Sequence, residues 1–208
     1  MSAQILEEFA GAPTPAFRCI NAGRKPNRRF FARLRHILHP PATTGHIAEA
    51  RLMLGTVGSE MTAFCRRHDG FILYQDHLSD TAGIEMFPID QWSKAGTQMR
   101  GWLDMLSDGD DPDCLGTGVA FATVPKSANY FIMPIEGPSA GRVFYAQHDD
   151  WYDGPFAEDF NAFLARVTLD PVKLLRKDLG SFARYSDGVT SIEWIPEMYY
   201  ADSTLIDD

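Results

Sequence analysis

Apolar residues recur along this chain with two different spacings, and the spacing changes along its length. Up to about residue 65 they recur every three or four positions, which is the period of an amphipathic helix. This spacing predicts a basic helix over residues 23–39 and two short helices over 46–58 and 59–65 that are joined by a turn, with Ser59 as an N-cap. The buried face of the basic helix is expected to hold Phe30, Phe31, Leu34, Ile37 and Leu38.

The middle of the chain has shorter apolar runs, which are rich in aromatic and branched residues and are bounded by turn residues. Runs of this kind predict strands, here at 70–75, 82–87, 118–124, 129–136 and 141–147.

Helical spacing returns in two places. Residues 88–106 and 157–168 each carry an apolar stripe, the first behind a proline that suits a first helical turn. The segment 193–202 fits an added edge strand and a docking segment equally well, because its periodicity does not separate the two.

Successive strands with helices at both ends predict an α+β fold with a single, largely antiparallel or mixed sheet of about five to six strands flanked by helices. The length of 208 residues suits one main core with additions. We expect a basic N-terminal helical arm over residues 1–40, a core domain over 41–170, and a C-terminal helix over 171–208 whose aromatic and acidic tail packs on the core.

Charge is divided unevenly along the chain, whose formal net charge is −9. Residues 1–40 carry seven Lys or Arg and two Asp or Glu, which is +5, whereas the remaining residues carry twelve and twenty-six, which is −14. An acidic body disfavours DNA or RNA as its ligand and favours a basic protein partner. The arginines of residues 23–39 are expected to face water or the acidic body, and a nucleic-acid or membrane-surface role for them is the less favoured alternative.

Several classes of protein are not supported by the sequence. The first residues lack a secretory signal and no apolar run is long enough to span a membrane, so a cytoplasmic protein is expected. Three dispersed cysteines favour reduced thiols, with Cys65 in the core. The sequence has no nucleotide-binding glycine loop, no nucleophile motif and no zinc motif, so neither a cofactor nor an enzyme is expected.

Two dense acidic runs are the candidate sites. "SDGDDPDC" contains Asp108, Asp110 and Asp111 but lacks the ligand spacing of a calcium loop. "VFYAQHDDWYDGPF" is interpreted as the end of a strand and an acidic loop that leads into a helix. A metal or acid/base role for His148, Asp149 and Asp150 is the alternative, although one local cluster is a poor substitute for ligands that converge from several elements.

Four features follow one another over about residues 46–167. They are "FCRRHDGF" closing a helix, "GIEMFPIDQW" leading into another, the strands "GVAFATV" and "NYFIMPIE", and "GRVFYAQHDD" followed by "FAEDFNAFLARV". In this order they resemble the SUKH superfamily, a group of α+β domains that includes bacterial toxin-immunity proteins. Asp69 stands where asparagine is usual in the family.

The resemblance implies a non-enzymatic binding module that covers the functional cleft of a cognate toxin, often a nuclease or deaminase. An acidic surface would complement a basic cleft of that kind. The partner-binding residues that we expect are Asp149, Asp150, Trp151, Tyr152 and Asp153, with Asp108, Asp110 and Asp111. The competing hypothesis is a metal-dependent hydrolase that uses His148, Asp149 and Asp150.

Overall fold

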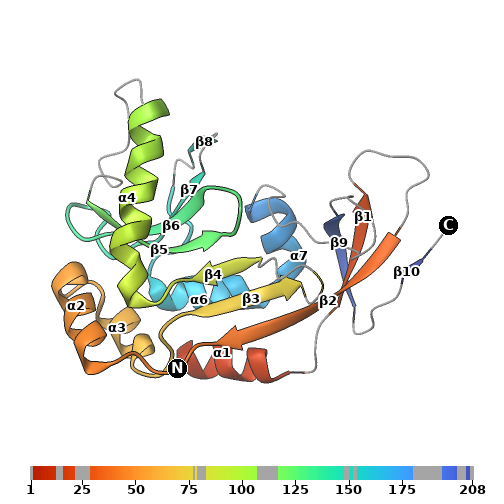
Figure 1. Cartoon of the computed structure of the whole chain (residues 1–208), viewed down its shortest axis with the longest axis horizontal. Coiled ribbons are helices and arrows are strands. Elements are labelled where there is room, and N and C mark those ends of the chain that lie inside the picture. The colour runs from red at the N-terminus through yellow and green to blue at the C-terminus, as the bar shows by residue number, and fades with distance from the viewer. Residues whose placement is uncertain are drawn as a thin grey trace.

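The computed structural model describes most of the chain (Figure 1). The described residues are 2–12, 16–21, 29–76, 78, 83–106, 117–147, 150–151, 154–179, 194–200 and 205–206. Its helices are α1 (Ser2–Gly11), α2 (Thr44–Leu54), α3 (Ser59–Cys65), α4 (Ile89–Leu106), α6 (Phe160–Leu169), α7 (Pro171–Lys173) and the π-helical turn η1 (Leu174–Asp178). Its strands are β1 (Ala16–Asn21), β2 (Arg29–Leu38), β3 (Phe71–Asp76), β4 (Ile84–Met86), β5 (Gly118–Val124), β6 (Asn129–Pro134), β7 (Phe144–Gln147), β8 (Asp150–Trp151), β9 (Trp194–Tyr200) and β10 (Leu205–Ile206).

All strand pairs in the described part of the chain are antiparallel, and they form one open sheet in the order β8-β7-β6-β5-β4-β3-β2-β1-β9, with β10 beside β2. The predicted α+β class is confirmed. The six strands β2–β7 build the body beside the helices, and the shorter or outer strands extend it at both edges (Figure 1).

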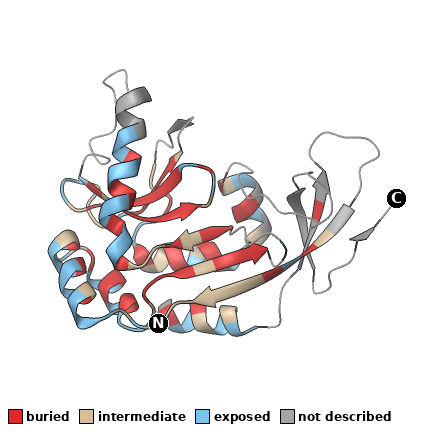
Figure 2. Cartoon of the chain, viewed as in Figure 1, coloured by how far each residue is buried: buried red, intermediate tan, exposed pale blue. Residues whose placement is uncertain are grey.

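Helices cover both faces of this body. Strands β5–β7 are mostly buried (Figure 2). Because side chains alternate along a strand, each of these strands contributes to two hydrophobic clusters. The cluster on one face joins α4 to the sheet through Ala95, Met99, Ala120, Tyr130, Ile132 and Ala146. The cluster on the other face joins α6 to the sheet through Phe121, Phe131, Tyr145, Phe160, Phe163 and Leu164.

The helix predicted over the basic segment is wrong, because residues 29–38 form strand β2. Ala32 and Leu34 are fully buried on one side of the strand, whereas Arg33 between them is exposed, which is the alternation of a strand. The segment also has apolar residues at helical spacing, but pairing of its backbone with β1 and β3 outweighs that local pattern.

Strand β2 divides its length between two neighbours. Residues 29–33 pair with β1, and residues 34–38 pair with β3, with a shift in register between Arg35 and Ile37. Strand β9 pairs with the free side of β1, so the segment Trp194–Tyr200 is an edge strand, one of the two structures predicted for it. We call β1, β9, β10 and residues 29–33 of β2 the outer sheet, which lies at the right-hand end of the molecule in Figure 1.

The other predicted helices are present. Helices α2 and α3 are joined by a turn, and Ser59 is the first residue of α3 and not its N-cap. The N-cap position is occupied by Gly58. A larger residue there would place its Cβ 2.3 Å from Cβ of Leu54, so the position requires glycine. The predicted inward face of α6 is confirmed, and no described helix is long and apolar enough to cross a membrane.

Candidate functional site

Most of the sequence-predicted site residues lie outside the described part of the chain. These are Asp108, Asp110, Asp111, His148, Asp149, Tyr152 and Asp153. The backbones of Asp150 and Trp151 are described, because these two residues form β8. For the two acidic segments, the structure therefore describes only the neighbouring helix α4 and the short strand β8.

The elements that precede the two acidic segments end close together. Helix α4 crosses the sheet so that Met99 packs in one cluster with Ala120 of β5, Ile132 of β6 and Ala146 of β7. Its last residue, Leu106, and β8 lie at the same end of the molecule, at the top of Figure 1. We call the end of the body where α4 and β8 stop the acidic end, because the acidic segments 104–113 and 148–153 contain or adjoin these elements in the sequence.

After β7 the chain reverses direction and forms β8, which pairs with β7, before it reaches α6. Gln147 pairs with Asp150 and Ala146 pairs with Trp151, so His148 and Asp149 are the two residues that connect the paired strands. The predicted strand ending at Gln147 is present, and a second short strand follows it where a loop was expected.

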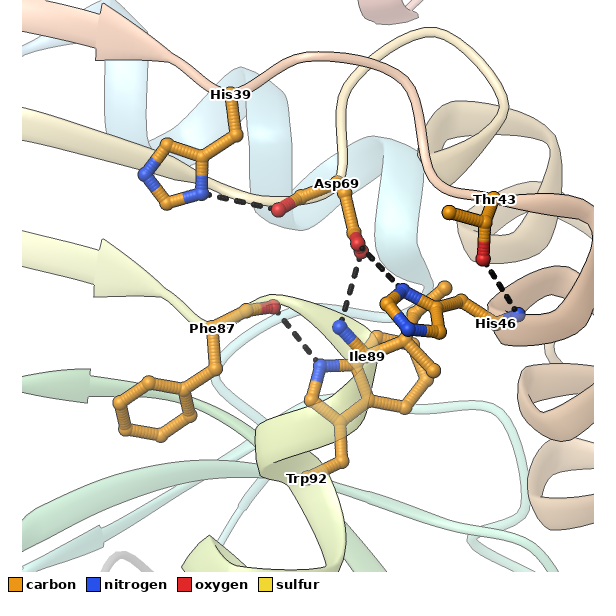
Figure 3. Close-up of polar contacts among 7 residues, drawn as sticks. All are labelled: His39, Thr43, His46, Asp69, Phe87, Ile89 and Trp92. Carbon is orange, nitrogen blue, oxygen red and sulfur yellow. Dashed lines mark hydrogen bonds and ion pairs between the residues drawn. The ribbon is translucent and has the colours of Figure 1, made fainter.

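A buried carboxylate fixes the other end of α4 (Figure 3). Asp69 is 8% exposed, and its Oδ1 accepts a hydrogen bond of 2.9 Å from the backbone N–H of Ile89, the first residue of the helix. Its Oδ2 lies 3.1 Å from Nδ1 of His46 on α2. Asp69 therefore supplies an acceptor to an unpaired N–H at the positive end of α4, from a position twenty residues earlier in the chain.

The backbone around Asp69 is fixed as well. Its N–H donates to the carbonyl of Pro40 at 2.8 Å, and its carbonyl lies 3.0 Å from Nδ1 of His39. Gly70 follows with a φ of +95°, and a Cβ there would lie 2.3 Å from the carbonyl oxygen of Met86. The "HDG" sequence is thus a structural junction between α3, β4 and the start of α4.

His68, just after α3, is paired with an acidic side chain of α1. Its Nε2 lies 2.7 Å from Oε1 of Glu7, and its Nδ1 lies 3.1 Å from the carbonyl of His39. Arg67 also donates to Glu7 at 2.7 Å, so the pKa of Glu7 is lowered, mainly by the hydrogen bond from His68.

A second histidine lies at a strained point of the sheet. His36 of β2 accepts a 3.1 Å hydrogen bond at Nδ1 from the backbone N–H of Tyr74, which has a φ of +59° in β3. Phe9 of α1 covers the imidazole, with 4.6 Å between the ring centroids. Burial lowers the pKa of His36 to about 4, so this side chain is a neutral acceptor at physiological pH.

The described side chains do not form a recognisable catalytic or metal site. Within the described ranges, no group of three His, Cys, Asp or Glu residues could hold a metal ion. Burial, followed by the nearby charge of Asp69, raises the pKa of Cys65, so this thiol is suited to packing and not to nucleophilic attack. A cleft of about 130 Å³ between α2, α4 and β5 contains Met53, Ser93 and Arg100, and it is smaller than typical small-molecule sites.

Neither a scan against protein-family models nor a search of curated proteins returns a match to this chain. The SUKH resemblance therefore stays a prediction from the residues that carry it. Sequence reasoning missed the long-range role of Asp69, and the signal available for it was the Asp-Gly pair at the end of α3.

Proposed function

We propose that this protein is a non-enzymatic protein-binding module whose acidic end covers a basic cleft on a partner protein, as an immunity protein covers its toxin. One observation carries the proposal. The supports of the two most acidic segments, α4 and the β7–β8 hairpin, end on the same side of the body.

Much of the acidic surplus of the chain lies in these two segments, and residues 187–208 add six Asp or Glu and no Lys or Arg. Segments 104–113 and 148–153 contain eight aspartates and no lysine or arginine. By contrast, the exposed side chains described between residues 41 and 179 comprise seven acidic and nine basic residues, which are mixed over the surface. The negative charge of the body is therefore local, and a local field selects and orients a basic partner.

The base beneath the two segments is rigid. Asp69 holds the first turn of α4, and the packing of Met99 on Ala120, Ile132 and Ala146 holds its middle against the sheet. Binding surfaces carried on fixed elements lose less conformational entropy when a partner docks. The buried His and Asp side chains serve this packing, which supports a binding role over a catalytic one.

The proposal is tested by co-expression with the protein encoded in the adjacent reading frame, followed by affinity measurement at several salt concentrations. We expect a complex that weakens as salt rises. The triple variants Asp108→Asn/Asp110→Asn/Asp111→Asn and Asp149→Asn/Asp150→Asn/Asp153→Asn should each weaken it by about tenfold or more, because charges across an interface contribute about 1 kcal/mol or more in total.

The matched control removes three negative charges elsewhere. Glu49→Gln/Glu60→Gln/Glu136→Gln changes exposed side chains outside the acidic end and should leave the affinity within about twofold of the unmodified protein. Equal losses in the control and in the acidic-end variants would contradict the proposed surface, and the absence of any complex would contradict this partner.

The competing hydrolase hypothesis has its own test. Thermal melting is followed with and without Mg²⁺, Mn²⁺, Zn²⁺ and Ca²⁺, since a metal that binds the native state raises the midpoint. We expect no metal-specific shift. An increase of several degrees that Asp149→Asn and Asp150→Asn abolish would favour the metal-dependent hydrolase and overturn the binding module.

A further inference from the structure

Helix α4 covers its face of the sheet only in part. The hydrophobic cluster beneath it is built from β5, β6 and β7, through Ala120, Tyr130, Ile132 and Ala146. Strands β2, β3 and β4 contribute no residue to that cluster. No described helix lies in front of these three strands in Figure 1, where α6 lies behind β3 and β4. On the α4 side, the sheet therefore has an uncovered area over β2–β4.

Two isoleucines of this area belong to neither hydrophobic cluster. Ile37 of β2 is directly opposite Ile72 of β3, and directly opposed residues of an antiparallel pair share a face. Both side chains are half-buried, whereas Leu73 and Ile84 on the other face of β3 and β4 are fully buried. Within the described residues, the clusters beneath α4 and α6 include neither Ile37 nor Ile72. This apolar pair is therefore available to a partner.

A carboxylate continues the same row of side chains. Glu85 of β4 is directly opposite Ile72 and, on its other side, opposite Thr123 of β5. The hydroxyl of Thr123 donates to the carbonyl of Asn129 at 2.6 Å, and Glu85 makes no hydrogen bond or ion pair with another described residue. Burial raises the pKa of Glu85, and the nearby charge of His39 opposes that rise only in part. The carboxylate is thus half-desolvated and lacks a compensating partner.

The same face carries an exposed cation. Arg33 is four residues from Ile37 on β2, so the two side chains lie on one face. Arg33 makes no ion pair with another described residue, whereas Nε of Arg35, between them, donates a 2.6 Å hydrogen bond to Gln75. Strand spacing places Arg33 and Glu85 roughly 15 Å apart, which is too far for a direct pair within one chain.

We propose that this open face, defined by Arg33, Ile37, Ile72 and Glu85, is the interface of a symmetric homodimer. In a two-fold dimer one surface meets a copy of itself, so a cation and an anion that lie apart on each copy can meet across the interface. Arg33 of each copy lies against Glu85 of the other. The isoleucines lie between the two ion pairs and supply the apolar contact.

A second copy of the chain fits this face better than a partner of one charge sign does. A basic partner would place a like charge against Arg33, and an acidic partner would do the same at Glu85. A guanidinium is weakly hydrated and forms two parallel hydrogen bonds with a carboxylate, which suits a half-desolvated acid. Because the face spans parts of only three strands, we expect a weak dimer.

The test is sedimentation equilibrium of the full chain from about 5 to 500 µM, which covers the affinities of small interfaces. We expect a monomer–dimer equilibrium with a Kd on the order of 50 µM. Arg33→Glu and Glu85→Arg should each weaken dimerisation by about tenfold or more, because each places like charges together at two symmetric positions. The double variant Arg33→Glu/Glu85→Arg exchanges the two charges and should restore the Kd to within about threefold.

Matched variants separate this interface from a general charge effect. Arg51→Glu and Glu49→Arg make the same changes of charge at exposed positions of α2, and each should leave the Kd within about twofold. Ile37→Thr/Ile72→Thr keeps branched side chains that suit strands but removes apolar contact, so it should weaken dimerisation by about tenfold. Its urea midpoint, measured on dilute monomer, should change much less than that of Ile84→Thr, because Ile84 belongs to the core.

Circular dichroism checks that each variant is folded. Glu85→Gln removes the charge with the smallest change in shape, so it replaces Glu85→Arg if that variant does not fold, and it should weaken dimerisation by about threefold or more.

Four results would overturn the proposal. They are a chain that stays monomeric at every concentration, a double variant no tighter than the single ones, a loss in Arg51→Glu or Glu49→Arg as large as in Arg33→Glu, and a dimer that Ile37→Thr/Ile72→Thr leaves unchanged. The proposed function does not enter this test, because it concerns the acidic end and a different partner.

Discussion

At the scale of single residues, the junction at Asp69 and Gly70 shows how a short turn can determine the position of a long helix. Asp69 holds the first N–H of α4, and Gly70 brings the chain against the carbonyl of Met86. Both effects act between segments that are distant in sequence. A substitution at Gly70 should therefore lower the free energy of unfolding by more than the strain of a left-handed φ alone would.

Gly70→Ala is predicted to lower the free energy of unfolding by at least about 3 kcal/mol, because it combines a left-handed φ with a backbone clash. The control is Gly137→Ala, where φ is +77° and no atom lies within 4 Å of the added Cβ, and the expected cost is about 1 kcal/mol. Urea denaturation measures both. Equal costs would show that the approach to Met86 has relaxed.

His36 is predicted to make stability depend on pH. Its pKa is about 4 in the folded protein and is lowered from 6.5, so the folded state favours the neutral imidazole. The contribution is fully present above about pH 6.5 and is lost as the pH falls toward 4, by up to about 3 kcal/mol.

The variant His36→Gln keeps an acceptor for the N–H of Tyr74 but does not titrate, so it isolates this effect. Urea denaturation of both proteins is measured from about pH 7 to pH 4.5, where histidine but few carboxylates titrate. The difference in stability between the two proteins should change in favour of the variant as the pH falls. A constant difference would show that His36 is not a buried neutral acceptor.

At the scale of elements, helices and strands with a strong local pattern were predictable and those that depend on distant pairing were not. The apolar stripe of α6 identifies its buried face, because Phe160, Phe163, Leu164 and Val167 recur at helical spacing. The same kind of spacing misled at residues 29–38, where Phe31, Leu34 and Leu38 fit a helix but the backbone pairs with β1 and β3. No local sequence pattern predicts that Trp194–Tyr200 pairs with β1, a strand near the N-terminus.

The position of α1 is set by a few contacts. Leu6 is fully buried, Glu7 pairs with His68 and Arg67, and the helix lies against α6 and β2. Leu6→Ala should lower the free energy of unfolding by about 3 kcal/mol through lost burial and a cavity. Ile5 is 43% exposed, so Ile5→Ala should cost less than about 1 kcal/mol.

Hydrogen exchange adds a local measurement to this pair of variants. Amides of α1 should exchange faster in Leu6→Ala than in Ile5→Ala, and those of β5 and β6 should remain among the most protected. Uniformly faster exchange over the whole chain would contradict a local role for Leu6.

At the scale of the whole molecule, charge is separated between two regions. Helix α4 and β8, next to the two acidic segments in the chain, end on one side of the body, whereas the basic strands β1 and β2 form part of the outer sheet (Figure 1). The sign and the size of the net charge of each region could be counted from the sequence. The sequence could not reveal that α4 and β8, the elements next to these segments in the chain, end on the same side of the body, because that depends on how α4 crosses the sheet.

The division of β2 between two ladders bears on how this protein can be shortened. A deletion of residues 1–40 would take away the partner of β3 and leave that central strand as a new, hydrophobic edge. A deletion that stops at residue 28 would keep β2 but strip β1 from it and leave β9 without its neighbour. The N-terminal segment is therefore not a detachable appendage, and the role of its arginines is better examined by exchanging side chains than by trimming the chain.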